Sequence, residues 1–299
     1  MSQQWVLKTA KLVFAALLVT LSGFAAPLPT VLAGEQASDA KRRVNLAGRQ
    51  RMLTQRMTKA ACMITLKVEV PFHTEMLQAS HRDFAKALAA LELGDPGLRV
   101  YGQETNSRVL TGLADVKSHW DGFDQPLREM MGTGQFGGQR ADEIFQRNMP
   151  LLKRMNEVVS LIEQVHANPN EMLLANAVAI NIAGRQRMLS QKIGKEFCQV
   201  MLGWNAEETK AALEKTISVF ETSHGALASG LPAAGIIPPP TKEIRLALDA
   251  FEKRWMTLKS LMQGLIAGTA GPDDLQVFAR ENDTLLKQMH AIVGMYEKV

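Results

Sequence analysis

The hydrophobic positions of this 299-residue chain recur at the three- to four-residue spacing of amphipathic helices, and strand-type alternation is never sustained. Clusters of Gly and Pro interrupt the pattern at intervals and mark the loops. We expect Ser38 or Asp39 to cap the first helix and Pro71 to end it. The pattern predicts eight helices, over about 38–70, 74–93, 103–131, 141–166, 171–202, 206–229, 242–267 and 273–298.

These helices form two sets of four, because the chain contains an internal repeat. The segment Asn45–Arg56 (NLAGRQRMLTQR) recurs as Asn181–Lys192 (NIAGRQRMLSQK), 136 residues later. Equivalent residues further along keep similar offsets, namely Cys62 and Cys198, Phe84 and Phe220, and Trp120 and Trp255. Short connections favour antiparallel packing. The sequence therefore predicts an all-α fold of two tandem four-helix up-down bundles, over residues 34–168 and 169–299.

The first 33 residues have the organisation of an export signal. Lys8 and Lys11 precede the apolar stretch Leu12–Ala26, and the small-residue pattern of a cleavage site, Val31–Ala33, precedes Gly34. The apolar stretch is shorter than the roughly 20 residues of a spanning helix. We therefore expect residues 1–33 to be a cleaved signal peptide and the protein to be periplasmic, with an uncleaved anchor as the alternative.

Composition and charge narrow the class of protein. The chain is 46% hydrophobic and 21% charged, which allows a buried core. Without Lys8 and Lys11 it has 32 basic and 30 acidic residues, so it lacks the basic surface of a nucleic-acid-binding protein. Glu221 and His224 have the spacing of a bundle metal motif, but the first repeat has no counterpart. The sequence also has no motif for haem attachment, for a Ser/His/Asp triad or for a Gly-rich phosphate loop. We therefore expect that the protein is not an enzyme and binds no cofactor or metal.

The first helix of each repeat has two different faces. At 100° per residue, Arg51 shares its side with small or weakly polar residues, while Leu46 and Leu53 lie opposite and suit the bundle core. The residues around Arg51 are Ala47, Gly48, Gln55, Thr58 and Cys62, and those around Arg187 are Ala183, Gly184, Gln191 and Cys198. Small residues allow another helix to approach closely, and an arginine buried there needs a partner.

Pairing the two small faces about a pseudo-twofold axis would bring Arg51 and Arg187 together. Two guanidinium groups repel each other unless an anion lies between them, and their planar forks suit a small oxyanion or carboxylate. The alternative is that each arginine pairs with a neighbouring carboxylate. Asn45 and Asn181 offer polar contacts to the anion, or else a structural hydrogen bond to an adjacent helix. The candidate ligand-binding residues are Arg51, Arg187, Asn45, Asn181, Gly48, Gly184, Gln55 and Gln191.

Cys62 and Cys198 are the two cysteines of the chain, and each follows its arginine by 11 residues. In a parallel pair of first helices they would meet across the same axis, and an oxidising compartment favours a disulfide between them. The sequence also allows two separate buried thiols.

The signature Asn-x-Ala-Gly-x-x-Arg-Met resembles that of the periplasmic domains of nitrate/nitrite sensor kinases. It is even more similar to the N-terminal domain of type IV pilus methyl-accepting chemotaxis transducers, where Ala-Gly-Arg-Gln-Arg-Met-Leu-Ser-Gln is typical. The resemblance implies an up-down four-helix bundle. In the nitrate sensors, the arginine before the methionine, one from each subunit, holds nitrate between paired first helices; that position is Arg51 and Arg187 here. The chain departs from the nitrate sensors at Arg49-Gln50 and Arg185-Gln186, where they have a small polar and an apolar residue.

The sequence thus predicts a periplasmic sensor-type protein that binds a small anion, such as nitrate, nitrite or a carboxylate. We expect it to report to a membrane-bound receptor or kinase. The alternative is an interaction module of a pilus, chemoreceptor or envelope system without a small ligand. The oligomeric state stays open, as does whether the bundles pair within one chain or between chains.

Overall fold

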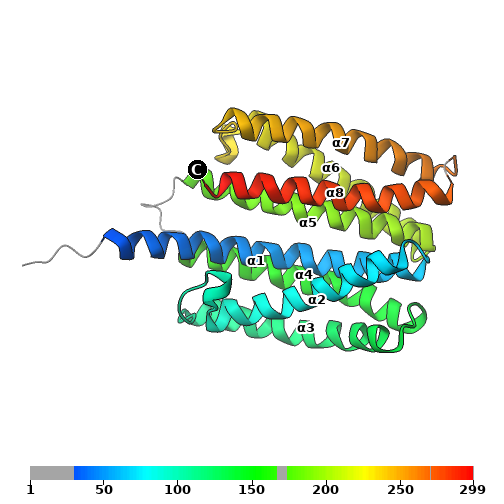
Figure 1. Ribbon diagram of the computed structural model, residues 1–299, viewed down its shortest axis with the longest axis horizontal. Helices are drawn as coiled ribbons and strands as arrows, with labels where there is room; N and C mark the ends of the chain where they lie inside the picture. Colours follow the sequence, from blue (N-terminus) through cyan, green and yellow to red (C-terminus); the bar gives the residue numbers. More distant parts are fainter. Residues whose placement is uncertain (1–29, 167–173, 270, 299) are drawn as a thin grey trace, which may run out of the picture.

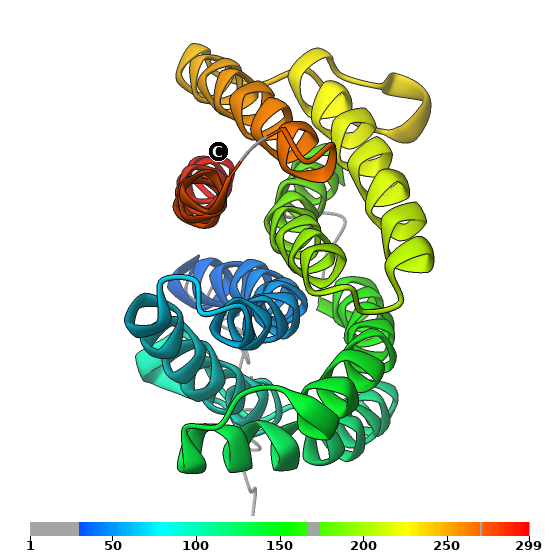
Figure 2. The same ribbon diagram turned by 90° about the vertical axis from the view of Figure 1, so that its right-hand side faces the viewer.

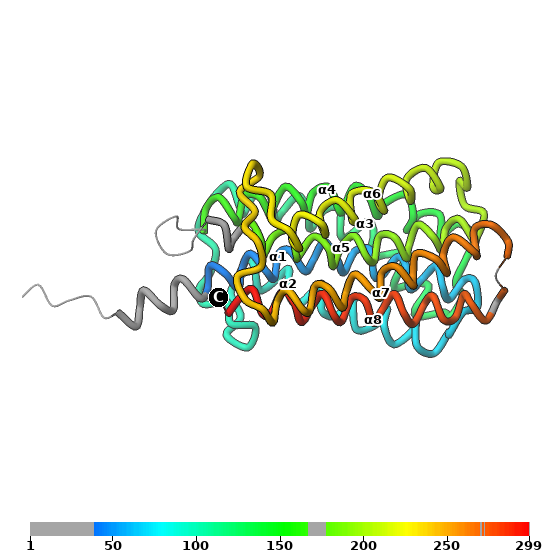
Figure 3. Tube along the Cα trace, turned by 90° about the horizontal axis from the view of Figure 1, so that it is seen from above, coloured from blue at the N-terminus to red at the C-terminus, as the bar shows by residue number. Residues whose placement is uncertain are grey.

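The computed structural model describes residues 30–166, 174–269 and 271–298, and these ranges contain eight α-helices and no strand. The all-helical tandem fold is as predicted. The helices are α1 (Thr30–Thr65), α2 (Val70–Leu93), α3 (Ser107–Thr133), α4 (Gly138–His166), α5 (Leu174–Leu202), α6 (Ala206–Ser229), α7 (Lys242–Ile266) and α8 (Pro272–Tyr296). All eight helices run roughly along the long axis of the molecule (Figure 3).

The predicted boundaries of the first helix are wrong at both ends. The helix α1 begins at Thr30, so Ser38 and Asp39 lie inside it instead of capping it. It ends at Thr65, and a turn follows in which Glu69 adopts a left-handed backbone with φ of 45°. Pro71 lies in the first turn of α2. Proline cannot continue a helix, because it has no N–H to donate. It fits the first turn of a helix, however, because the N–H groups there have no partner within the helix.

The predicted export signal falls mostly outside the described residues, since residues 1–29 are not among them. Residues 30–33 form the first turn of α1. Of the helices that the structure describes, none has a stretch long and apolar enough to cross a bilayer.

Each half of the chain forms one bundle with the same packing. In the first, α1 packs against α2 and α4, and α3 packs against α4; in the second, α5, α6, α7 and α8 repeat this arrangement. The two cores use equivalent aromatic pairs. Trp120 stacks on Phe84 with a centroid separation of 4.3 Å, and Trp255 packs on Phe220 at 4.5 Å. The repeat in the sequence is therefore a repeat in the packing.

The two bundles are joined along α1 and α5, which run parallel side by side through the middle of the molecule (Figure 1). An end-on view shows α1, α4, α5 and α8 meeting at the centre, with the other helices on opposite outer sides (Figure 2). Cys62 in α1 and Cys198 in α5 form a disulfide, with their Cα atoms 6.2 Å apart. The bundles therefore pair within one chain, and the paired surfaces are the two small-residue faces.

Candidate functional site

Arg51 and Arg187 both point into the α1/α5 interface, where only 5% and 1% of their surface is exposed. A Cβ atom placed on Gly184 would lie 3.4 Å from Nη2 of Arg187 and 3.9 Å from Nη2 of Arg51. A Cβ atom on Gly48 would lie 3.3 Å from Nη2 of Arg51. The two guanidinium groups therefore converge over Gly184, and a larger residue there would take up the space between them.

Each arginine donates a hydrogen bond to the asparagine of the opposite bundle. Nη2 of Arg51 donates to Oδ1 of Asn181 at 3.0 Å, and Nη2 of Arg187 donates to Oδ1 of Asn45 at 2.7 Å. Helical side chains lean toward the helix N-terminus, so an arginine meets a residue earlier on the parallel neighbour. The structure thus brings together Asn45, Asn181 and both arginines in one pseudo-symmetric cluster.

The second contact of each arginine comes from the last helix of its own bundle. Nη1 of Arg51 lies 3.5 Å from Oδ1 of Asn156, and Nη1 of Arg187 lies 3.2 Å from Nδ1 of His290. Because arginine can only donate, Nδ1 of His290 accepts and the proton of the neutral imidazole is on Nε2. Burial, followed by the charge of Arg187, lowers the pKa of His290 to about 4, which keeps the ring neutral.

Among the described residues, these arginines have no negative partner at contact distance. Their hydrogen-bond acceptors are neutral, and no carboxylate of the described residues lies within 4.0 Å of either guanidinium. Burial lowers the pKa of Arg51 to about 10 and that of Arg187 to about 9, and it outweighs the opposing effects of Glu163 and Glu297. A buried charge without a counter-ion destabilises the protein, so the cluster favours an added anion.

Gln55 and Gln191, the other two predicted site residues, are buried further along the same interface. Nε2 of Gln55 donates to the hydroxyl of Thr54 at 3.0 Å, and Nε2 of Gln191 donates to Asn282 at 3.2 Å. Their Oε1 atoms have no partner within the described chain. Neither glutamine is hydrogen-bonded to an arginine there, so they belong to a neighbouring polar layer.

That layer contains a pair of buried lysines that the sequence analysis missed. Nζ of Lys59 donates to Oδ1 of Asn282 at 2.9 Å, and Nζ of Lys195 donates to Oδ1 of Asn148 at 3.1 Å. Burial lowers the pKa of Lys59 to about 7 and that of Lys195 to about 8. The sequence feature that could have revealed these lysines is their separation of 136 residues, which is the same as that between Arg51 and Arg187.

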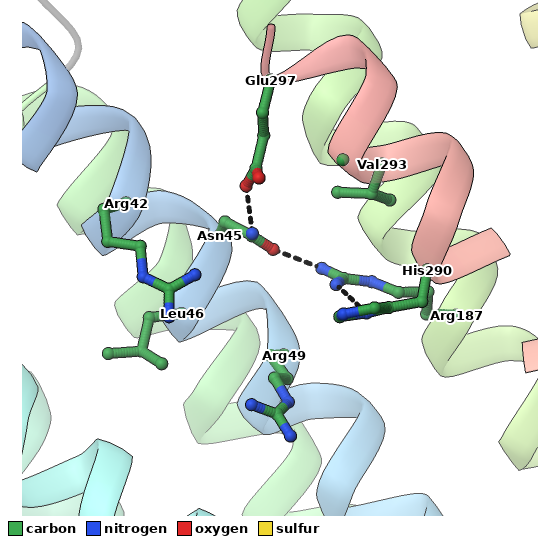
Figure 4. Close-up of a pocket in the computed structure, with 9 residues that line it drawn as sticks. Arg42, Asn45, Leu46, Arg49, Arg187, His290, Val293 and Glu297 are labelled. Carbon is green, nitrogen blue, oxygen red and sulfur yellow. Dashed lines mark hydrogen bonds between the residues drawn. The ribbon is translucent and has the colours of Figure 1, made fainter. Parts of the chain in front are cut away.

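A cavity of about 150 Å³ lies between α1 and α8, beside Arg187 (Figure 4). Its polar lining residues are Arg42, Asn45, Arg49, Arg187, His290 and Glu297. The side-chain amide of Asn45 donates to the Glu297 carboxylate while its oxygen accepts from Arg187 (Figure 4). The cationic cluster is therefore bordered by a space large enough for a small ligand.

Two helical bundles meet along their signature helices α1 and α5, so the same four-helix domain is present in duplicate. The family model "Type IV pili methyl-accepting chemotaxis transducer N-term" matches the chain twice, over residues 33–142 and 170–281. The two matches cover more than half of the chain, which therefore belongs to this family.

One similar curated protein is the methyl-accepting chemotaxis protein McpN of Pseudomonas aeruginosa. It is 31% identical over 116 residues, which cover 39% of this chain and 21% of that protein. The chain thus matches about a fifth of the length of this relative. No solved structure matches the chain. The resemblance to nitrate/nitrite sensors stays a prediction.

Proposed function

We propose that this protein is a periplasmic sensor that binds one small planar anion between α1 and α5, with Arg51 and Arg187 as its main ligands. The observation that carries this proposal is the convergence of two buried guanidinium groups over Gly184, with only neutral hydrogen-bond partners among the described residues. An anion there would neutralise both charges in an environment of low dielectric constant.

The geometry of the cluster suits an anion of the size of nitrate, nitrite or a short carboxylate. Guanidinium groups bind such planar oxyanions through two parallel hydrogen bonds. Asn45 and Asn181 have carboxamide groups whose oxygens accept from the arginines in the free protein. When an anion takes over as acceptor, the amide groups can turn and donate to it.

The tandem repeat would let one chain form the whole site. In the nitrate sensors that the signature resembles, the two arginines come from two subunits. Here Arg51 and Arg187 come from the two halves of one chain. Family membership and the relative's name, a methyl-accepting chemotaxis protein, support a partner among membrane-bound receptors or kinases, or a pilus component.

A second candidate function is docking to a protein partner without a small ligand. It is favoured by a groove of about 460 Å³ between α6 and α7, whose large apolar lining residues are Leu213, Ile217, Met262 and Ile266 and whose charged ones are Lys210, Glu214 and Lys259. The same groove is not needed for anion binding, so an anion titration separates the two functions.

Thermal unfolding of the purified protein against nitrate, nitrite, sulfate, formate and acetate tests the proposal. A ligand at about 100 times its dissociation constant adds about 2.7 kcal/mol of stability. The stabilisation should disappear in Arg51→Ala and Arg187→Ala and persist in Arg185→Ala, whose side chain is exposed on the same helix. If no anion stabilises the parent protein, the docking function becomes the better account.

A further inference from the structure

The cavity between α1 and α8 carries more positive than negative charge. Arg42, Arg49 and Arg187 line it, and Glu297 is the one carboxylate among its lining residues. Arg187 is almost fully buried, and its Nε atom has no hydrogen-bond partner within the described chain. His290 carries its proton on Nε2, because Nδ1 accepts from Arg187. Arg187, which lines the cavity, therefore keeps one donor that is not used within the described chain.

Glu297 is connected to this charge through a neutral residue. Its carboxylate accepts from the amide of Asn45, and Asn45 in turn accepts from Arg187 (Figure 4). Glu297 follows the last residue of α8 directly, so this contact ties the end of α8 to α1. The carboxylate of Glu297 thus lies in the region where an external carboxylate or nitrate would bind.

The pseudo-symmetric position, between α5 and α4, has the same plan with different residues. Asn156 and Glu163 correspond to His290 and Glu297 at an offset of 134 residues, and Val178 replaces Arg42. The Oε1 atom of Glu163 is buried without a partner in the described chain, and burial raises the pKa of Glu163. The two carboxylates are therefore equivalent in sequence but not in their contacts.

We propose that the anion reaches the site between Arg51 and Arg187 through the α1/α8 cavity, which borders Arg187, and that Glu297 is a built-in carboxylate which an external planar oxyanion displaces. This inference rests on the proposed function. It adds the side of the interface from which the anion enters, and it names Glu297 as the group that competes with the anion. One water molecule needs about 10–15 Å³ of such a cavity, so a cavity of about 150 Å³ has room for an anion like nitrate or acetate. Displacement of Glu297 would release the end of α8 from Asn45. Binding of the anion would therefore change how the end of α8 is held.

Calorimetric titration of the full chain with sodium nitrate and sodium acetate, in separate experiments, tests the competition. Glu297→Gln removes the competing charge and should tighten binding on the order of tenfold, within the usual range of coupling between two sites. Glu163→Gln is the matched control and should change the dissociation constant less than about threefold, well below that coupling range. Arg42→Ala should weaken binding, because it removes a charge from the cavity. The more strongly affected of the two anions identifies the ligand class.

The structural consequence is tested by hydrogen exchange with and without saturating anion. Release of Glu297 should accelerate amide exchange at residues 293–298 and leave residues 159–164 unchanged, opposite to the general slowing that ligand binding causes. Equal effects of Glu297→Gln and Glu163→Gln, or slower exchange at 293–298, would overturn the inference but leave anion binding intact. Absence of binding to the parent protein would instead overturn the proposed function.

Discussion

Arg51 of the first bundle and Asn181 of the second are joined by a hydrogen bond of 3.0 Å across the α1/α5 interface. Asparagine is an unusual main partner for a buried arginine, because it offers an acceptor but no charge. Arg187 and Asn45 repeat the relationship at 2.7 Å. Two copies of a neutral contact thus leave two buried positive charges without a carboxylate at contact distance among the described residues.

Replacing Asn181 with aspartate should supply the missing charge from within the protein. Asn181→Asp places a carboxylate against Nη2 of Arg51, and a hydrogen bond between charged groups contributes about 1 kcal/mol more than a neutral one. We expect a higher unfolding temperature without anion and a much smaller increase on adding anion.

The control is Asn106→Asp at the N-cap of α3, where aspartate and asparagine cap equally well. It should leave the response to anion unchanged. An Asn181→Asp protein that is destabilised, or that still gains full stability from the anion, would show that Arg51 does not need a negative partner.

Gly184→Ala should separate helix stability from ligand binding. The added methyl group would lie at ordinary contact distance, 3.4 Å, from Arg187, so the folded structure tolerates it. Replacing a helical glycine stabilises the helix by about 0.5–1 kcal/mol. The same methyl group occupies the space over which the two guanidinium groups converge, so the anion-induced stabilisation should fall.

Gly225→Ala is the matched control, since Gly225 is exposed in α6 and an added Cβ atom meets nothing within 4 Å. Chemical denaturation of both variants, with and without anion, should show the gain in stability in each and the lost anion response only in Gly184→Ala. Retention of the full response in Gly184→Ala would argue against an anion in that space.

The repeat and the helical period were enough to predict the fold and the composition of the interface. A 136-residue offset placed Arg51 and Arg187 at equivalent positions, and the small residues around them indicated close helix packing. Helical angle alone does not show which residue on the neighbouring helix a long side chain reaches. The contact of Arg51 with Asn181, six residues earlier in the repeat, therefore appears only in the structure.

Two other features were not predictable for separate physical reasons. Lys59 lies about 80° around the helix from Arg51, and lysines are rarely buried, so the sequence gives no reason to place it in the interface. Pro71 is compatible with both the end of one helix and the beginning of the next. Only the turn at residues 66–69, with its left-handed backbone at Lys67 and Glu69, decides between these.

Lys59 should make stability depend on pH above neutrality. Its pKa is about 7 in the folded protein, against 10.5 for a lysine side chain in water, so the unfolded chain binds more protons between these values. Stability should therefore rise with pH between about 7 and 9. Lys59→Met should weaken that rise and, at about pH 7, increase the free energy of unfolding by about 1–4 kcal/mol, as seen when apolar residues replace buried charges.

Urea unfolding of the parent protein and Lys59→Met at about pH 6, 7, 8 and 9 measures this dependence. Lys287→Met serves as the control, because Lys287 is exposed at the surface of α8 and should leave the pH profile unchanged. A parent protein whose stability falls between about pH 7 and 9 would contradict a buried lysine in this position.

The disulfide between Cys62 and Cys198 should contribute strongly to stability. It closes a loop with a sequence separation of 136 residues, and removing a native disulfide costs about 2–5 kcal/mol. We expect the Cys62→Ala/Cys198→Ala protein to unfold at lower guanidinium concentration, and the parent protein to match it after reduction. Insensitivity of the parent protein to reductant would mean that the two bundles are held together without this bond.

The most direct test of the account is calorimetric titration of the purified protein with the anion that stabilises it most. A single site shared by the two arginines predicts one anion per chain, with binding weakened at least about 100-fold in both Arg51→Ala and Arg187→Ala, which is about 2.7 kcal/mol. Arg185→Ala should bind like the parent protein. Two equivalent anions per chain, or binding that survives the loss of either arginine, would contradict a single site shared by α1 and α5.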